Sequence, residues 1–297
     1  MFEILIKISS IVLPVFVFLT MFNVGLTQKL SNILAYLKNR KFAIVMLLAN
    51  FLFAPFLMWV LLYFFPLDPY LETGLTIFSM CAGAPFLIKL TQESKHELAL
   101  GASTMIILVL GTVVFVPLVL PNVIPQVEVS GGAIAWTLIK QLILPIILGL
   151  LLIKFLPRPG KTIQPWVAKI GNWALYVMLV STLAGYFPQL KEIFGQGAIL
   201  IGIVFILGAF GIGYLLGGLS RKDHLQDVAA LGTAQKNTAA SMIIAAQNFG
   251  DHPQVLVIIT IANSLGIAML LVIAKVLSKD NKIKIVEDYE EVTYENV

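Results

Sequence analysis

The sequence predicts an all-α integral membrane protein, and three observations lead to this prediction. Of its 297 residues, 59% are hydrophobic and only 12% are charged, whereas a soluble domain carries about 25% charged residues. The hydrophobic residues form repeated runs of roughly 20, the length that an α-helix needs to cross a bilayer, while the strands of a membrane barrel alternate over about 10 residues. Two of these runs are broken near their centres by glycine, proline or polar residues, a feature typical of transporters.

Nine runs are long enough to be transmembrane helices. In chain order we expect them at residues 4–26, 42–65, 72–90, 98–120, 134–156, 166–187, 197–219, 227–248 and 254–277. Together they form one transmembrane domain, residues 1–277. Segment 27–41 is basic and amphipathic, so it is either a short helix on the membrane surface or a solvated loop. Residues 278–297 turn from basic to acidic, and we expect them to form a disordered cytoplasmic tail.

Basic residues gather in alternate connections between the expected spans. The connections after spans one, three, five and seven and the C-terminal tail hold Lys29, Lys38, Arg40, Lys41, Lys95, Arg158, Lys161, Arg221, Lys222, Lys279, Lys282 and Lys284. The intervening connections hold Lys191 as their one basic residue, beside acids such as Asp68 and Asp251. The positive-inside rule places the basic side in the cytoplasm. The sequence therefore predicts a multi-pass protein of the cell (inner or plasma) membrane, with its N-terminus outside and its C-terminus in the cytoplasm.

The third and eighth spans are the two that are interrupted. In the third, Gly83, Ala84 and Pro85 stand near the centre, where proline removes a backbone donor and clashes with the preceding turn. The centre of the eighth holds Gly232, Thr233, Gln235, Lys236 and Asn237. The two breaks are five spans apart. Because this number is odd, the second broken span enters the membrane from the opposite side to the first. This pattern indicates an inverted repeat of spans one to four and six to nine, whose broken helices form a substrate site.

Lys236 is the candidate site residue with the most unusual position. A charge at the bilayer centre costs from about 2.5 kcal/mol upward and is retained where it faces protein, a cavity or a ligand. Lys236 lies about ten residues, or about 15 Å, from either end of its span. It is either a counter-charge to a bound anion or a structural residue that meets a carbonyl group or water. Asn50 and Asn263 lie near the expected crossing, as site residues or as ordinary interhelical hydrogen-bond partners.

Several sequence segments carry a resemblance to a known family. They are MFNVGLTQKL after the first span, NRKFAIVMLLANFLFAP opening the second, the break CAGAP, LILPIILGLLL in the fifth and LGTAQKNTAA in the eighth. In this order and spacing, the chain resembles the bile acid:sodium symporter family, whose members carry organic anions. The resemblance implies a panel domain and a core domain, with two discontinuous helices, here spans three and eight, crossing in the core.

The resemblance also assigns roles to individual residues. Gln235 matches a glutamine, and Asn50 a polar residue, of the family's sodium site, and Asn263 matches an asparagine that contacts bound anions. Lys236 or Asn237 takes the place of the asparagine that follows the glutamine. With Lys236, Asn237 and Asn263, the expected substrate site includes Gly83, Ala84, Pro85 and Thr233.

The chain departs from the family's pattern in two places. The symporters have a glutamate four residues before the glutamine, where this chain has Leu231. They have a serine and an asparagine after the glycines of the first break, where the chain reads Pro85, Phe86, Leu87 and Ile88. Because sodium favours oxygen ligands, these changes should abolish one sodium site and weaken the other.

We therefore expect a secondary transporter of organic anions, bile-acid-like or small carboxylates, that works by alternating access. In this interpretation Lys236 is the counter-charge, sodium is not obligatory, and a proton released by Lys236 would make H+ the coupling ion. The alternative is a sodium-coupled symporter with Na+ bound near Gln235 and Asn50. An alternative of another class is a membrane sensor that binds an anion without transporting it.

Other functions fit the sequence less well. His96, His224 and His252 all fall in connections, and no span presents paired carboxylates, so we do not expect an enzyme. The formal net charge of +4 comes from the connections, so no nucleic-acid partner is expected. The expected partners are an organic anion and membrane lipid, and no cofactor is expected besides a coupling ion.

Overall fold

The fold consists of helices throughout the part of the chain that the structure describes. The computed structural model describes residues 2–28, 39–124, 131–185, 187, 193, 195–219 and 223–294. Its helices are α1 (Phe2–Thr27), α3 (Arg40–Leu48), η1 (Ala49–Phe53), α4 (Ala54–Phe64), α5 (Pro69–Met80), α6 (Phe86–Glu93), α7 (Leu98–Val123), α8 (Gly131–Leu138), η2 (Ile139–Ile143), α9 (Leu144–Phe155), α10 (Pro157–Gly185), α12 (Ala198–Gly218), α13 (Asp223–Ala234), α14 (Thr238–Asn248) and α15 (Pro253–Tyr294). Segment 29–38, on which the prediction of a surface helix or loop depends, lies outside the described residues.

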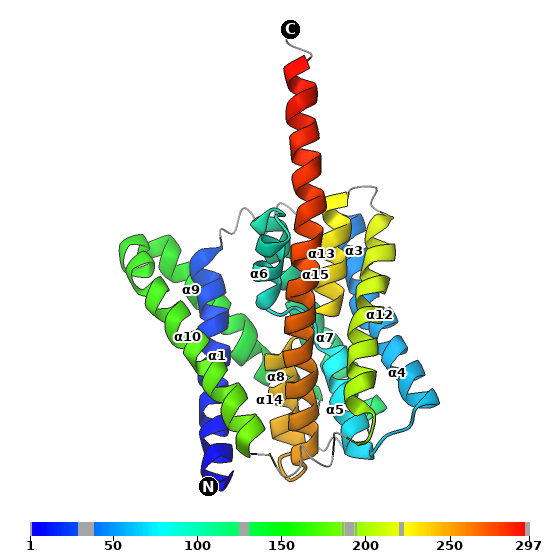
Figure 1. Cartoon of the computed structure of the whole chain (residues 1–297). Helices are drawn as coiled ribbons and strands as arrows, with labels where there is room; N and C mark the ends of the chain where they lie inside the picture. The colour runs from blue at the N-terminus through cyan, green and yellow to red at the C-terminus, as the bar shows by residue number, and fades with distance from the viewer. Residues whose placement is uncertain are drawn as a thin grey trace.

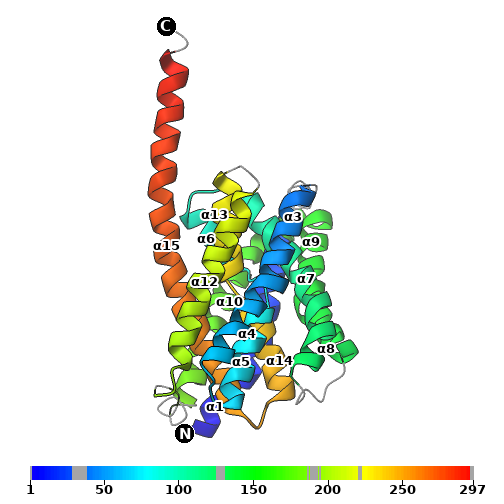
Figure 2. The ribbon, with the colours of Figure 1, turned by 90° about the vertical axis from the view of Figure 1, so that its right-hand side faces the viewer.

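Six helical segments of the described chain are long and apolar enough to cross a membrane. They are residues Phe2–Thr27, Arg40–Phe64, Leu98–Val123, Gly131–Phe155, Ala198–Gly218 and Pro253–Lys279. Figures 1 and 2 show the helices running roughly along one common axis, with the two termini at opposite ends of the molecule. The prediction of an all-helical membrane protein is confirmed at this level.

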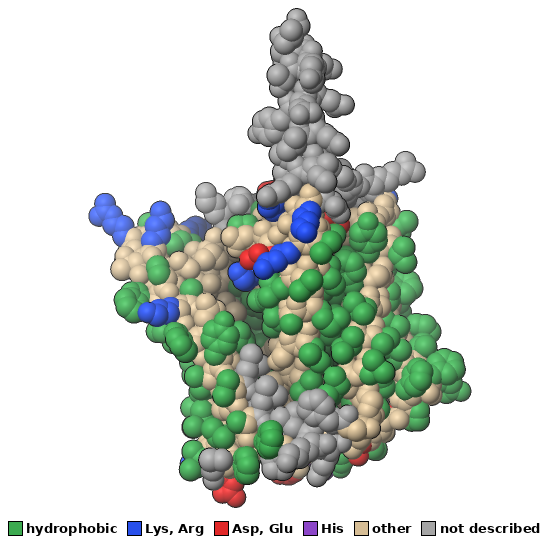
Figure 3. All heavy atoms as spheres, in the orientation of Figure 1, with side chains coloured by type: hydrophobic (Ala, Val, Ile, Leu, Met, Phe, Trp, Pro, Cys, Tyr) green, Lys and Arg blue, Asp and Glu red, His purple; other side chains and the backbone are tan. Residues whose placement is uncertain are grey.

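Charged side chains gather at the two ends of this axis. In Figure 3, most of the Lys and Arg side chains lie at the end from which α15 projects, and acidic side chains are visible at both ends. Between them the surface is largely hydrophobic, and it includes exposed aromatic residues such as Trp59 and Trp166. This is the surface that a bilayer requires.

Helices α1, α9 and α10 lie side by side at one edge of the molecule (Figure 1), with α1 in contact with both of the others. On the other side of the molecule, α12 packs closely on α13 at Gly213. A Cβ atom at Gly213 would lie 2.5 Å from the carbonyl oxygen of Ala229, so only glycine permits this approach. The contact positions α13, which carries one of the two breaks.

The first break separates α5 from α6. Helix α5 begins where Asp68 accepts a hydrogen bond from the Tyr70 N–H at 2.9 Å, ahead of Pro69. It ends at Met80, and Gly83 then adopts a left-handed conformation with φ of 82°. A Cβ atom there would lie 2.4 Å from the Val109 backbone nitrogen, so both the conformation and the available space require glycine.

The second break separates α13 from α14 and is shorter than the polar stretch in the sequence. Gly232 and Thr233 lie inside α13, and the helix ends at Ala234. Thr233 fits the helix because its hydroxyl donates to the carbonyl of Ala229 at 2.8 Å. The interruption is therefore confined to residues 235–237, and Asn237 begins α14 as its N-cap.

Two π-helical turns, η1 and η2, each precede a proline, Pro55 and Pro145. In a regular α-helix a proline clashes with the carbonyl four residues before it. In η1 the Ala54 N–H instead bonds to the carbonyl of Ala49, five residues back, which widens the helix at that point. Asn50 lies within η1 and is fully buried.

The last helix, α15, is 42 residues long. In the structure α15 continues to Tyr294 and extends well beyond the other helices (Figure 1).

Candidate functional site

The two helix breaks lie against each other. Ala82 of the first break and Lys236 of the second form an antiparallel β-bridge. The Asn237 N–H donates to the carbonyl of Cys81 at 2.9 Å, and Asn237 Nδ2 donates to the carbonyl of Gly83 at 3.0 Å. The two interrupted helices therefore meet in the interior at their non-helical residues.

Side chains satisfy the backbone groups that the breaks leave free. The Thr112 hydroxyl of α7 lies 2.9 Å from both the nitrogen and the oxygen of Ala82. Asn237 Oδ1 accepts a hydrogen bond from the Ala240 N–H at 3.0 Å and so caps α14. Because irregular backbone at membrane depth must be satisfied by protein or by water in a cavity, these contacts make a permanent break possible.

Lys236 is buried at this crossing, with 1% of its surface exposed. Its Nζ donates to Asn50 Oδ1 at 3.3 Å and lies 5.6 Å from the centre of the Phe205 ring. Asn50 Nδ2 donates in turn to the carbonyl of Met46 at 3.0 Å and to Thr233 Oγ1 at 3.3 Å. Within the described part of the chain, Lys236 has no carboxylate partner. In its protonated form, the ammonium of Lys236 is therefore solvated by one amide and one aromatic ring.

Most of the other residues expected in the site belong to the two breaks. Gln235 is 4% exposed, and its Nε2 donates to the carbonyl of Lys236 at 3.3 Å. Gly83 and Ala84 are buried in the first break, and Pro85 is the N-cap of α6. Asn263 is also buried, on α15, but no hydrogen bond among the described residues joins its side chain to this group.

Two buried hydroxyl groups near the breaks have no hydrogen-bond partner among the described residues. They are the Oγ1 atoms of Thr104 and Thr238. Thr238 directly follows the second break, and the methyl group of Thr104 would lie 3.3 Å from a Cβ atom at Gly232. Unpaired buried hydroxyls are costly, so a water or ligand that reached these two would satisfy them.

Sequence reasoning missed Thr104, Thr112, Phe205 and Thr238. Threonine in a membrane helix commonly bonds to the carbonyl one turn before it, as Thr233 does. Nothing in the sequence distinguished Thr112, which bonds across to another helix. Phe205 is one of 19 phenylalanines, and only the fold brings it over Lys236.

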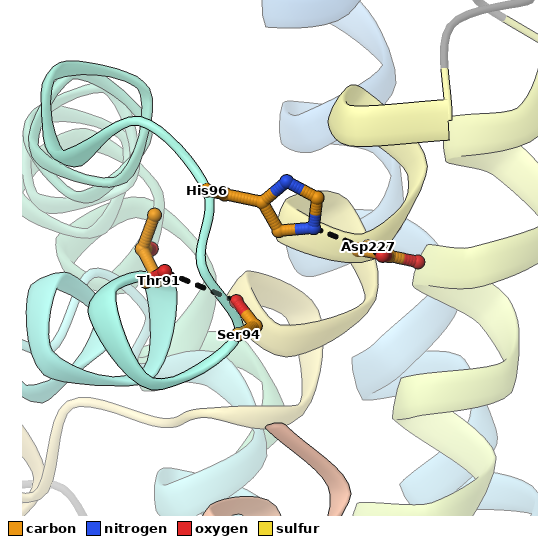
Figure 4. A network of polar contacts seen from close by, with 4 residues as sticks. All are labelled: Thr91, Ser94, His96 and Asp227. Carbon is orange, nitrogen blue, oxygen red and sulfur yellow. Dashed lines mark hydrogen bonds and ion pairs between the residues drawn. The ribbon is translucent and has the colours of Figure 1, made fainter. Parts of the chain in front are cut away.

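Two histidine contacts also join the two broken helices. In each, a histidine from the connection after one broken helix contacts the helix that precedes the other break. His96, in the connection between α6 and α7, lies with its Nε2 atom 2.9 Å from Asp227 Oδ2 of α13 (Figure 4). At the opposite end, His252 stacks on Tyr70 of α5 with 3.8 Å between ring centres. We refer to these two contacts as the histidine clasps. They link α5, α6, α13 and α14 at both ends.

This architecture defines a class of protein: a multi-pass helical membrane protein with two interrupted helices that meet around a buried cation, as secondary transporters have. Residues 14–196, more than half of the chain, match the Sodium Bile acid symporter family. The chain belongs to this family, and the resemblance noted in the sequence is confirmed. The matched region contains Asn50 and the first break, whereas Lys236 lies beyond it.

Curated relatives are similar to the chain at low identity. The probable sodium/metabolite cotransporter BASS2, chloroplastic, of Oryza sativa subsp. japonica is 24% identical over 231 residues, which cover 77% of this chain and 55% of the relative. The uncharacterized sodium-dependent transporter YocS of Bacillus subtilis is 25% identical over 251 residues, covering 82% and 75% respectively. The probable sodium/metabolite cotransporter BASS5, chloroplastic, of Oryza sativa subsp. indica is 23% identical over 242 residues, covering 78% and 60%. The chain thus spans little more than half of the length of the BASS2 relative.

Proposed function

We propose that this chain is a secondary transporter of organic anions that works by alternating access, with Lys236 as a fixed cation at its binding site. The observation that carries the proposal is the buried position of Lys236 Nζ, 3.3 Å from Asn50 Oδ1 and without a carboxylate partner in the described chain. A buried positive charge with no counter-ion attracts an anion strongly, because the surrounding protein screens it weakly. Thr104 and Thr238 offer further hydrogen-bond donors to the anion.

Asn50 is the residue that the resemblance places in a sodium site. The Lys236 ammonium lies against the oxygen of Asn50 and so takes a position where a sodium ion would be expected to bind. Together with Leu231 in place of the family's glutamate, this supports anion binding without obligatory sodium. Release of a proton by Lys236 during the cycle would couple transport to H+.

The proposed cycle requires a nine-span arrangement with an inverted repeat. We assign α5, α6 and α7 to one copy and α13, α14 and α15 to the other. In both copies a helix of 12 residues precedes the break, and the two histidine clasps join the copies at opposite ends. In this assignment α1, α9 and α10 belong to the panel domain and the broken helices belong to the core domain, with the N-terminus on the outer side of the cell membrane and the C-terminus in the cytoplasm.

A sodium-coupled symporter is the second candidate. Its support is that the relatives are described as sodium-dependent or sodium/metabolite transporters and that Gln235 and Asn50 supply amide oxygens close to the break. In that case the Lys236 ammonium leaves Asn50 when sodium binds.

One experiment separates the two candidates. The purified chain is unfolded by heat with cholate or benzoate, in sodium, potassium and choline buffers of equal ionic strength. A ligand that binds the native state raises the unfolding temperature. We expect the same shift in all three buffers, and uptake of the same anion into proteoliposomes without sodium. A shift that needs sodium would establish the symporter instead, and binding without uptake would indicate the membrane sensor.

A further inference from the structure

A cavity lies apart from Lys236, between α4, α5 and α7. Its volume is about 450 Å³, within the range of about 300 to 1,000 Å³ of small-molecule sites. It runs beside α5 from Glu72, in the first turn, to Ser79 and Met80, immediately before the break. Neither Lys236 nor Asn50 lines it. We refer to it as the outer cavity, because α5 begins at the end of the molecule where the N-terminus lies (Figure 1).

Aromatic residues form one wall of the outer cavity. Phe56, Trp59 and Tyr63 of α4 are stacked in a row, with 5.7 Å and 5.8 Å between successive ring centres. They are 57%, 60% and 70% exposed, and their spacing along the helix places them on one face. An exposed aromatic face near the end of a membrane helix contacts lipid at the interface. The cavity therefore opens sideways to the bilayer.

Glu72 contributes the charge of the outer cavity. Its Oε1 accepts a hydrogen bond from the Leu67 N–H at 2.8 Å, and among the described residues it has no cationic partner. No Lys, Arg or His is among the described residues that line the cavity. The cavity thus repels an organic anion and attracts a cation, because a partly buried carboxylate is screened less than one in water.

The inner part of the outer cavity favours a hydrocarbon chain. Ser79 Oγ already donates to the Thr76 carbonyl at 2.8 Å, so this hydroxyl is not free to donate to a polar ligand. The wall opposite α4 and α5 is formed by Phe115 and Val119 of α7. An occupant that satisfies both ends has a cationic headgroup and an apolar tail.

We propose that the outer cavity binds a membrane lipid with a primary ammonium headgroup, whose ammonium meets Glu72 and whose acyl chain lies between Trp59 and Val119. A primary ammonium can donate hydrogen bonds to the free oxygen of the carboxylate, whereas a choline headgroup cannot. The occupant would contact the last turn of α5 before the break. This inference does not depend on the proposed function, because no residue of the crossing takes part.

The test is native mass spectrometry of the full chain with phosphatidylethanolamine, phosphatidylcholine and phosphatidylglycerol at equal concentrations. We expect retained phosphatidylethanolamine adducts in the wild type and about tenfold fewer in Glu72→Gln. The glutamine keeps an acceptor for the Leu67 N–H, so the fold is preserved. Glu3→Gln, an exposed acid at the same end of the molecule, is the matched control and should leave retention unchanged.

Three results would overturn the proposal. The first is equal retention of phosphatidylcholine and phosphatidylethanolamine, and the second is wild-type retention in Glu72→Gln. The third is displacement of the lipid by an equal concentration of glycerophosphoethanolamine, which would indicate a site for the free headgroup. Val119→Trp, which fills the cavity without altering Glu72, should also reduce phosphatidylethanolamine retention, and its unfolding temperature shows whether it has folded.

Discussion

Replacing Lys236 with methionine should separate stability from binding. In the unliganded protein the change removes a charge whose cost at the centre of a membrane helix is roughly 2.5 to 3.5 kcal/mol. It also removes the bond to Asn50 and the contact with Phe205, worth about 1.5 to 3 and about 2 kcal/mol. These contributions largely cancel, so we expect the free energy of unfolding to fall by no more than about 2.5 kcal/mol.

Anion binding should respond far more strongly to the same change. Removing one member of a buried charge pair costs about 2 to 5 kcal/mol, so the affinity for cholate or benzoate should fall at least about 30-fold. Thermal unfolding against ligand concentration measures both quantities in one assay. Lys236→Arg should retain binding. Lys140→Met is the matched control, since Lys140 lies 5.5 Å from the Trp136 ring but is exposed. Unchanged affinity in Lys236→Met would refute the role of Lys236 as the fixed cation.

Three further changes test the crossing and the clasp. Gly83→Ala forces a Cβ atom against α7 in a left-handed conformation, so it should lower stability by about 3 kcal/mol or more in chemical or thermal unfolding; an effect below about 1 kcal/mol would contradict the close approach. Thr112→Val leaves the N–H of Ala82 without its partner and should cost about 1 to 3 kcal/mol, whereas Thr112→Ser should cost less. His96→Gln and Asp227→Asn should show a coupling energy of about 1 kcal/mol or more in a double-mutant cycle of unfolding, and strictly additive effects would show that the clasp contributes nothing.

The positions of the breaks could be predicted from the sequence because local chemistry determines them. Gly83 can adopt a left-handed conformation, and Pro85 removes a backbone donor two residues later, so together they favour a break at this point. The second break was predicted too wide. Gly232 and Thr233 are weak helix formers that remain helical when neighbours pack on them, and those neighbours, Met46, Leu87 and Thr104, are distant in sequence. The π-helical turns were not predicted, since a proline in a helix can be accommodated in several ways.

The residues of the two breaks could be named from the sequence, but their contacts could not. A lysine at mid-membrane depth can be identified from the sequence as a candidate site residue, because a charge placed there costs free energy and is retained where it faces protein, a cavity or a ligand. Asn50 was expected nearby. The sequence does not show that the two are hydrogen-bonded, because side-chain geometry depends on the angle at which the helices cross. Thr112 and Phe205 could not be recognised, since their roles exist only once α7 and α12 are placed against the breaks.

The fixed charge of Lys236 gives the proposed transport cycle an electrical signature. When a monovalent anion binds, its charge and the ammonium cancel, so the loaded site is neutral as it changes sides. In the cycle without proton release by Lys236, the empty site returns with one positive charge, on which each 100 mV acts with about 2.3 kcal/mol. Net anion uptake into proteoliposomes should therefore slow when the interior is made negative with valinomycin and a potassium gradient, while one-for-one anion exchange should be unaffected. An exchange rate that depends on voltage would mean that the loaded site carries net charge, as it does when a sodium ion binds beside Lys236.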